Sequence, residues 1–114
     1  MESDPALFSA TELLSTYSQK TLSPVEVTKA VLERIEKYNP VFNAFRIFDA
    51  DSALNEAKAS ETRWSQGKPC GLVDGIPVTI KDLVATKGWS TRRGSLTTSD
   101  DGPWDEDAPL VARL

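Results

Sequence analysis

The sequence has no histidine and only one cysteine, Cys70, among its 114 residues. Histidine is the commonest general base and metal ligand, and zinc sites depend on histidine and cysteine, so a zinc site is nearly excluded. A single cysteine forms no disulfide within the chain, which is typical of proteins from a reducing compartment. We therefore expect a cytoplasmic protein that works without a metal or another cofactor.

Long apolar runs are also missing, since no stretch approaches the roughly 18 residues of a membrane-spanning helix. The net charge of −4 argues against nucleic acid as a partner. Much of the acidic charge lies between Asp100 and Asp107, where Pro103 and Trp104 interrupt it. That stretch lacks the ligand spacing of a calcium-binding loop, so we expect a solvated loop there.

Two capping boxes predict the first helices. Ser9 and Glu12 fit the start of a helix over residues 10–18. A second box opens at Ser23, with proline in the first helical position, and predicts a helix over 24–38 that ends at Pro40. A third helix is predicted over 51–66 from apolar and alanine residues at helical spacing, and Gly67 is expected to end it.

Two segments are predicted as strands, residues 43–48 and 76–81. The first is aromatic and apolar, and the second alternates apolar residues with others: Ile76, Pro77, Val78, Thr79, Ile80 and Lys81. Residues 83–104 are rich in glycine and proline and are expected to be a loop, and a further helix is expected to begin near Asp107. This pattern predicts an α/β fold, in which helices flank a mixed sheet.

Lys81 is the main candidate for chemistry, because it ends a strand that is expected to be half-buried. Burial disfavours the charged ammonium and makes a lysine available as a base near neutral pH. The structural alternative is an edge lysine that extends to water. Asp82 either fixes this lysine or accepts backbone N–H groups where the strand ends. Gly75 is expected to supply a turn that a side chain would hinder.

The residues from Gly71 to Asp82 read Gly-Leu-Val-Asp-Gly-Ile-Pro-Val-Thr-Ile-Lys-Asp, and a Lys-Gly pair and then Gly94-Ser95 follow. This series resembles the amidase signature family, whose members carry Leu-x-Gly-Ile-Pro-x-x-x-Lys-Asp. The segments Leu22–Thr28 and Asp107–Leu114 are similar to that family's helices. The resemblance covers nearly the whole chain.

The resemblance implies an amidase that uses a Ser–cis-Ser–Lys triad, with Lys81 as the catalytic lysine. Asp82 and Gly75 would support it. The family's two catalytic serines would lie beyond residue 114, so the chain alone is expected to be inactive. Ser95 matches the family's Gly-Ser pair, but no glycine elbow or histidine marks it as a nucleophile.

The same resemblance implies that residues 1–114 form the amino-terminal part of one amidase domain, incomplete in itself. Residues 1–68 would be a helical lead-in with one strand, and residues 69–114 would hold the lysine-motif strand, a loop and the start of the next helix. The expected partners are a small-molecule amide substrate and the remainder of the domain. Exposed sheet edges and apolar faces also favour a homo-oligomer.

Two other functions stay open. One is the glutaminase subunit of a tRNA-dependent amidotransferase, and the other is a non-catalytic interaction module derived from the fold. The run Gly-Trp-Ser-Thr-Arg-Arg, which begins at Gly88, and the acidic loop favour a free-standing amidase.

Overall fold

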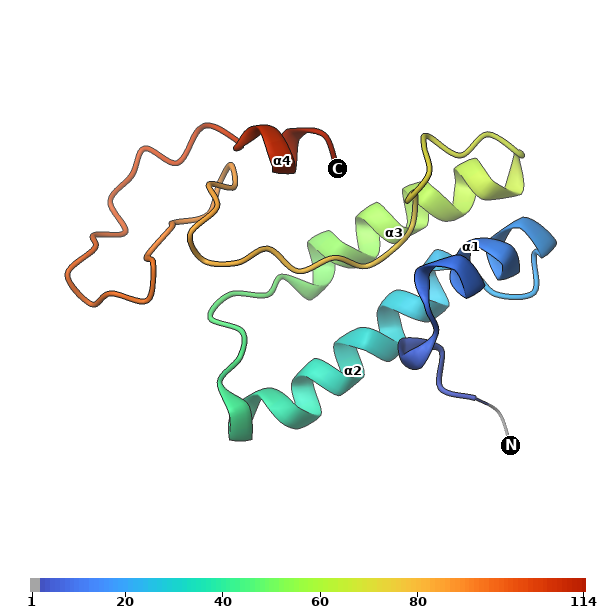
Figure 1. The fold of residues 1–114 in the computed structure, drawn as a ribbon, viewed down its shortest axis with the longest axis horizontal. Coiled ribbons are helices and arrows are strands. Elements are labelled where there is room, and N and C mark those ends of the chain that lie inside the picture. Colours follow the sequence, from blue (N-terminus) through green and yellow to red (C-terminus); the bar gives the residue numbers. More distant parts are fainter. Residues whose placement is uncertain (1–2) are drawn as a thin grey trace. The chain divides into compact units, whose positions relative to one another are not determined.

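The computed structural model describes residues 3–114, and the regular structure of these residues is helical (Figure 1). The elements in chain order are the 3-10 helix η1 (Pro5–Leu7) and the α-helices α1 (Ala10–Gln19), α2 (Pro24–Phe42), α3 (Ala50–Ser65) and α4 (Pro109–Ala112). The chain divides into two compact units, one that extends to Pro77 and one from Val78 to Leu114. Within residues 3–114, no helix combines the length and the apolar character needed to cross a membrane.

Both predicted capping boxes form. The Ser9 hydroxyl accepts the Glu12 N–H, and the Glu12 carboxylate accepts the Ser9 N–H at 2.7 Å. Ser23 and Glu26 repeat this arrangement at the start of α2, with a backbone-to-carboxylate distance of 2.8 Å. Each box satisfies two backbone donors that a helix otherwise leaves unpaired. The starts of α1 and α2 are therefore set by local sequence.

Helix α2 continues through Pro40 to Phe42, so the prediction that Pro40 ends it is wrong. Proline removes one N–H donor, but in the last turn this loss affects a single hydrogen bond of a long helix. The helix ends instead at Asn43, which adopts a left-handed conformation with φ 49°. The Asn43 N–H donates to the Asn39 carbonyl at 2.7 Å.

Helix α3 ends close to the predicted position, in a Schellman motif. The Gly67 N–H donates to the Trp64 carbonyl at 3.0 Å, and the Lys68 N–H donates to the Arg63 carbonyl at 2.9 Å. Gly67 has φ +68°, a conformation that suits glycine. The motif fixes the last turn of α3, which carries the side chains of Arg63 and Trp64.

The first unit has a small hydrophobic core built from α1 and α2. Leu13, Tyr17 and Val27 are its buried residues, and Trp64 and Ile76 are among the partly buried side chains that pack on it. Helices α2 and α3 lie side by side, and α2 also contacts η1 (Figure 1). The apolar stripes of the helices thus face one another.

Within residues 3–114 no strand forms, so the predicted α/β fold with a mixed sheet is wrong for this structure. Residues 43–48 are an irregular loop, and residues 76–81 have no ladder of hydrogen bonds. The described part of the chain has one isolated β-bridge, between Thr86 and Trp89. Alternating side chains become a strand only where a neighbouring chain segment pairs with the backbone, and residues 3–114 supply none.

A side chain replaces that partner at the first predicted strand. The Asn39 amide donates to the Phe45 carbonyl at 3.1 Å and accepts the Phe45 N–H at 2.9 Å. One side chain therefore satisfies both backbone groups of Phe45, and the loop after α2 folds back on the helix.

Candidate functional site

Lys81 lies in an irregular segment of the second unit and is exposed. Its carbonyl accepts the N–H groups of Leu83 at 2.7 Å and Val84 at 3.0 Å, which makes a tight turn directly after the lysine. The expected half-buried strand end is not present in this structure. The lysine is therefore presented on a turn, with its ammonium open to solvent.

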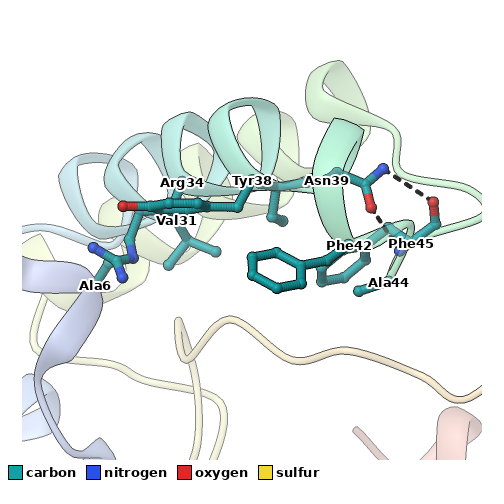
Figure 2. A pocket seen from close by; sticks show the side chains of 9 residues that line it. Ala6, Val31, Arg34, Tyr38, Asn39, Phe42, Ala44 and Phe45 are labelled. Atoms are coloured by element: carbon teal, nitrogen blue, oxygen red, sulfur yellow. Dashed lines mark hydrogen bonds between the residues drawn. The ribbon is translucent and has the colours of Figure 1, made fainter.

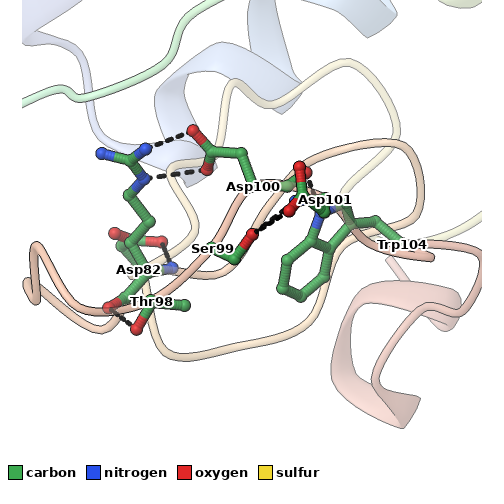
Figure 3. Close-up of polar contacts among 7 residues, drawn as sticks. Asp82, Thr98, Ser99, Asp100, Asp101 and Trp104 are labelled. Carbon is green, nitrogen blue, oxygen red and sulfur yellow. Dashed lines mark hydrogen bonds and ion pairs between the residues drawn. The ribbon is translucent and has the colours of Figure 1, made fainter.

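Asp82 links this turn to a later part of the same unit. Its carboxylate accepts the Arg92 N–H at 3.0 Å (Figure 3). Its carbonyl accepts the Arg93 N–H at 2.9 Å. The Asp82 carboxylate thus accepts one backbone N–H, and whether Asp82 supports catalysis or only the turn stays a prediction. The two contacts hold the residues after Lys81 against residues 92–93.

Arg92 extends the same network to the acidic stretch. Its Nε donates to Asp100 Oδ1 at 2.8 Å, and a second hydrogen bond joins its Nη2 to Asp100 Oδ2 (Figure 3). These hydrogen bonds raise the pKa of Arg92. The Trp104 indole N–H donates to the Asp100 carbonyl at 3.0 Å, and the Thr98 hydroxyl donates to the Arg92 carbonyl at 3.1 Å. The sequence analysis did not identify this pair.

The acidic stretch is therefore only partly a solvated loop. Besides the pair formed by Asp100, the Asp107 carboxylate accepts the Lys87 N–H at 2.6 Å. Among residues 3–114, no three histidine, cysteine or acidic side chains gather as a metal site. The acidic side chains with these contacts serve to close the loop.

Ser95 makes only local contacts in the second unit. Its hydroxyl oxygen lies 2.7 Å from the Thr97 hydroxyl oxygen and accepts the Thr97 N–H at 3.2 Å. This arrangement holds a turn and places no general base at Ser95.

Gly75, in the first unit, occupies a position that excludes a side chain. Its φ is +85°, and a Cβ atom there would lie 2.6 Å from Ser60 Oγ and 2.8 Å from Pro24 Cγ. Real Cβ contacts are not this short, and L-residues avoid this φ. Only glycine fits without a shift of these neighbouring side chains.

Asp74, the residue before Gly75, was not identified from the sequence. Its carboxylate accepts hydrogen bonds from Arg63 Nε at 2.7 Å, Arg63 Nη2 at 2.6 Å and the Cys70 N–H at 2.8 Å. The Arg63 guanidinium holds the pKa of the Asp74 carboxyl well below its usual range. The Asp74 carbonyl also accepts the Trp64 indole N–H at 3.0 Å. A charge pair eleven residues apart across a helix end has no sequence signature.

The first unit also has an apolar pocket of about 290 Å³ beside the second half of α2. Figure 2 shows the rings of Phe42 and Tyr38 at this pocket, and the Asn39 amide bonded to the loop beyond. The Arg34 guanidinium lies 5.5 Å from the centre of the Tyr38 ring. None of the residues that line the pocket was predicted as a site residue.

Comparison with known proteins gives a consistent result. A family model described as Amidase matches residues 26–114. The chain is 38% identical to a glutamyl-tRNA(Gln) amidotransferase subunit from Salinispora tropica over 111 residues, which cover 97% of this chain and 22% of that protein. It is 42% identical to the corresponding amidotransferase subunit from Chloroflexus aurantiacus over 93 residues, or 82% of this chain and 19% of that protein.

An acylamidase of Rhodococcus erythropolis is 33% identical over 93 residues, which cover 82% of this chain and 20% of that protein. The chain thus spans about a fifth of the length of the curated relatives that it matches. The family model covers the turn at Gly75, the lysine segment and the polar network of the second unit. The chain therefore belongs to the amidase signature family.

Proposed function

We propose that Lys81 is the general base of an enzyme that hydrolyses amides, in a protein that carries a whole amidase domain. The observation that carries the proposal is the position of Lys81 in the Gly-Ile-Pro-Val-Thr-Ile-Lys-Asp block, inside the stretch that the Amidase model matches. The acylamidase relative supports amide hydrolysis as the reaction.

The proposed mechanism requires a neutral lysine. The lysine Nζ takes a proton from a bridging serine, which takes the proton of a second serine as that oxygen attacks the amide carbon. The proton then passes to the leaving amine when the carbon–nitrogen bond breaks. Because Lys81 is exposed in residues 3–114, we propose that other parts of the amidase domain cover it and supply both serines.

Asp82 and Gly75 have supporting roles in this proposal. Asp82 holds the turn after the lysine through the Arg92 N–H, and Gly75 allows the chain to turn six residues before the lysine. Neither residue exchanges a proton with the substrate. Both act through the position of Lys81.

A second setting for the same chemistry is a glutaminase subunit that passes ammonia to a partner. The amidotransferase subunits in the comparison favour it as much as the acylamidase favours a free-standing enzyme. A preference for glutamine over small acyl amides would indicate the glutaminase. The cytoplasmic location, the homo-oligomer and the division of the domain at residue 68 stay predictions.

Substitution of the lysine tests the proposal directly. Lys81→Ala should lower kcat/KM for a good amide substrate by roughly 10³-fold or more in the whole protein, since a positioned general base contributes on the order of 10²–10⁴ in rate. Lys87→Ala is the matched control, because Lys87 is an exposed lysine of the same unit. It should stay within threefold of the wild type.

Equal activity of Lys81→Ala and Lys87→Ala would exclude Lys81 as the base. A wild-type protein that hydrolyses neither glutamine nor acyl amides would instead favour a non-catalytic interaction module.

A further inference from the structure

Asp74 and Gly75, which precede the segment 76–81, are held by several side chains. The Asp74 carboxylate binds both Arg63 nitrogens and the Cys70 N–H, and the Asp74 side chain is only 4% exposed. A bidentate arginine–carboxylate pair is strong and fixes orientation as well as distance. The proposed chemistry at Lys81 does not by itself require such a pair.

The backbone of the same two residues is also held. The Trp64 indole N–H donates to the Asp74 carbonyl at 3.0 Å, and the Tyr17 hydroxyl donates to the Gly75 carbonyl at 3.0 Å. The two rings lie 5.8 Å apart, between α1 and α3. Two consecutive carbonyls are therefore fixed by side chains from two helices.

Helix α2 also contacts this part of the chain, through Pro24. A Cβ on Gly75 would collide with Ser60 of α3 and Pro24 of α2, so the backbone at Gly75 lies directly against these two side chains. Side chains from α1, α2 and α3 thus surround Asp74 and Gly75, and we name this group the Asp74 socket. Its members are Tyr17, Pro24, Ser60, Arg63 and Trp64. The socket fixes one point of the chain in three dimensions.

Lys81 follows Gly75 by six residues, so the fixed point lies within about 20 Å of chain from the lysine. A general base contributes to rate only when it is held within a fraction of an ångström of the productive geometry. We infer that Arg63 and Asp74 are positioning residues, which fix the origin of the segment that carries the catalytic lysine. This inference rests on the proposed role of Lys81.

The Arg63–Asp74 pair is suited to a constant structural role. Because the hydrogen bonds from Arg63 keep the pKa of Asp74 well below its usual range, the carboxylate stays ionised throughout the pH range of amide hydrolysis. Removal of either partner leaves a nearly buried carboxylate or its donors unpaired, which loosens the turn that begins at Cys70.

The test compares Arg63→Gln and Asp74→Asn with Arg34→Gln in the whole protein. Arg34 is a matched control, because it pairs with Asp4 at 3.0 Å in the same unit and is not one of the socket residues. We expect Arg63→Gln and Asp74→Asn to lower kcat by roughly 10- to 100-fold with KM within threefold, because the substrate contacts remain while the base is displaced. Arg63→Lys keeps the charge without the fork and should recover part of the loss.

A second measurement does not depend on activity. Hydrogen exchange should become at least tenfold faster at the amides of Ile76, Leu83 and Val84 in Arg63→Gln, and should not change in Arg34→Gln. The first of these amides donates to Val73 and the other two donate to the Lys81 carbonyl. They therefore report on order from the socket to the lysine.

The outcomes separate the inference from the proposed function. If Lys81→Ala is neutral but exchange increases as described, the proposed function fails and the anchoring stands, though without a catalytic role. If Lys81→Ala is inactive but Arg63→Gln matches Arg34→Gln in kcat, the positioning role is overturned. Faster exchange confined to residues before Pro77, with kcat unchanged, also overturns it, because the socket would then serve only its own unit.

Discussion

The two units of this chain differ in the contacts that stabilise each of them internally. In the unit that extends to Pro77, the side chains of Leu13, Tyr17 and Val27 are buried in a common core. In residues 78–114, all of which the structure describes, no residue is buried, and the side chains of Arg92, Asp100 and Trp104 close the loops through polar contacts. The first unit has the packing of a small folded body, whereas the second has a conformation set by turns and charges.

The proposed supporting residues and the proposed catalytic lysine therefore lie in different units. The socket at Asp74 lies in the packed unit, and the lysine lies in the unit without a core. Loops commonly carry functional residues while a rigid scaffold positions them. The comparison therefore predicts that identical substitutions will have large effects in the first unit and small effects in the second.

The largest difference is expected for glycine substitutions. Gly75→Ala should lower the free energy of unfolding of the first unit by about 3 kcal/mol, because a Cβ at 2.6 Å from Ser60 Oγ adds overpacking to an unfavourable φ. Gly88→Ala is the control, since Gly88 has the same φ of +85° and no atom within 4 Å of its Cβ position. Urea unfolding followed by Trp64 fluorescence in a Trp89→Phe, Trp104→Phe background measures the effect. Equal effects on this transition would mean that the socket is not tightly packed.

A smaller difference is expected for valine truncation. Val27 is fully buried and Val78 is 61% exposed. Val27→Ala should destabilise the first unit by about 2 kcal/mol through lost burial and a small cavity. Val78→Ala should change stability by about 0.5 kcal/mol at most. If the two variants have the same urea midpoint, the first unit has no specific core.

The smallest effect at neutral pH is expected for the Tyr17 hydroxyl. Tyr17→Phe removes one hydrogen bond to the Gly75 carbonyl and should lower stability by about 1 kcal/mol. Tyr38→Phe, at a side chain that is 40% exposed, is the control and should have little effect.

The same tyrosine gives a test at alkaline pH. Burial raises the pKa of Tyr17 to about 12, above the value near 10 of an unfolded chain. The folded state therefore binds the proton more tightly, so stability is intact below pH 10 and falls between pH 10 and 12. Tyr17→Phe should reduce this fall and Tyr38→Phe should not. An unchanged alkaline transition in Tyr17→Phe would show that this hydroxyl is not buried in the folded state.

The helices of the first unit were predictable because their signals are local. Ser9 with Glu12 and Ser23 with Glu26 set two helix starts, and Gly67 sets one helix end. These residues act within a few positions of themselves, so the sequence alone contains the relevant contacts. The prediction that Pro40 ends α2 was wrong, because the effect of a proline depends on its position in the helix.

The irregular backbone at the two predicted strands was not predictable in the same way. Alternation over 76–81 describes which faces the side chains take, but a strand also needs a backbone partner, and residues 3–114 offer none. At residues 43–48 the partner is the Asn39 amide, which no periodic pattern reveals.

The candidate site residues also differ in whether the sequence could identify them. Lys81, Asp82 and Gly75 were identified through a motif, and their catalytic and supporting roles remain predictions. The pairs Arg63–Asp74 and Arg92–Asp100 were missed, because a charge has many oppositely charged candidates in a sequence and only the fold selects one.

The hydrogen bond from Tyr17 to Gly75 joins residues that are 58 positions apart. During synthesis, α1, α2 and α3 have local signals and can begin to form as they leave the ribosome, but this contact must wait until residue 75 has emerged. The lysine follows within the next six residues, less than about two seconds of translation at common rates. The order of synthesis therefore makes the support available just before the residue that it is proposed to position.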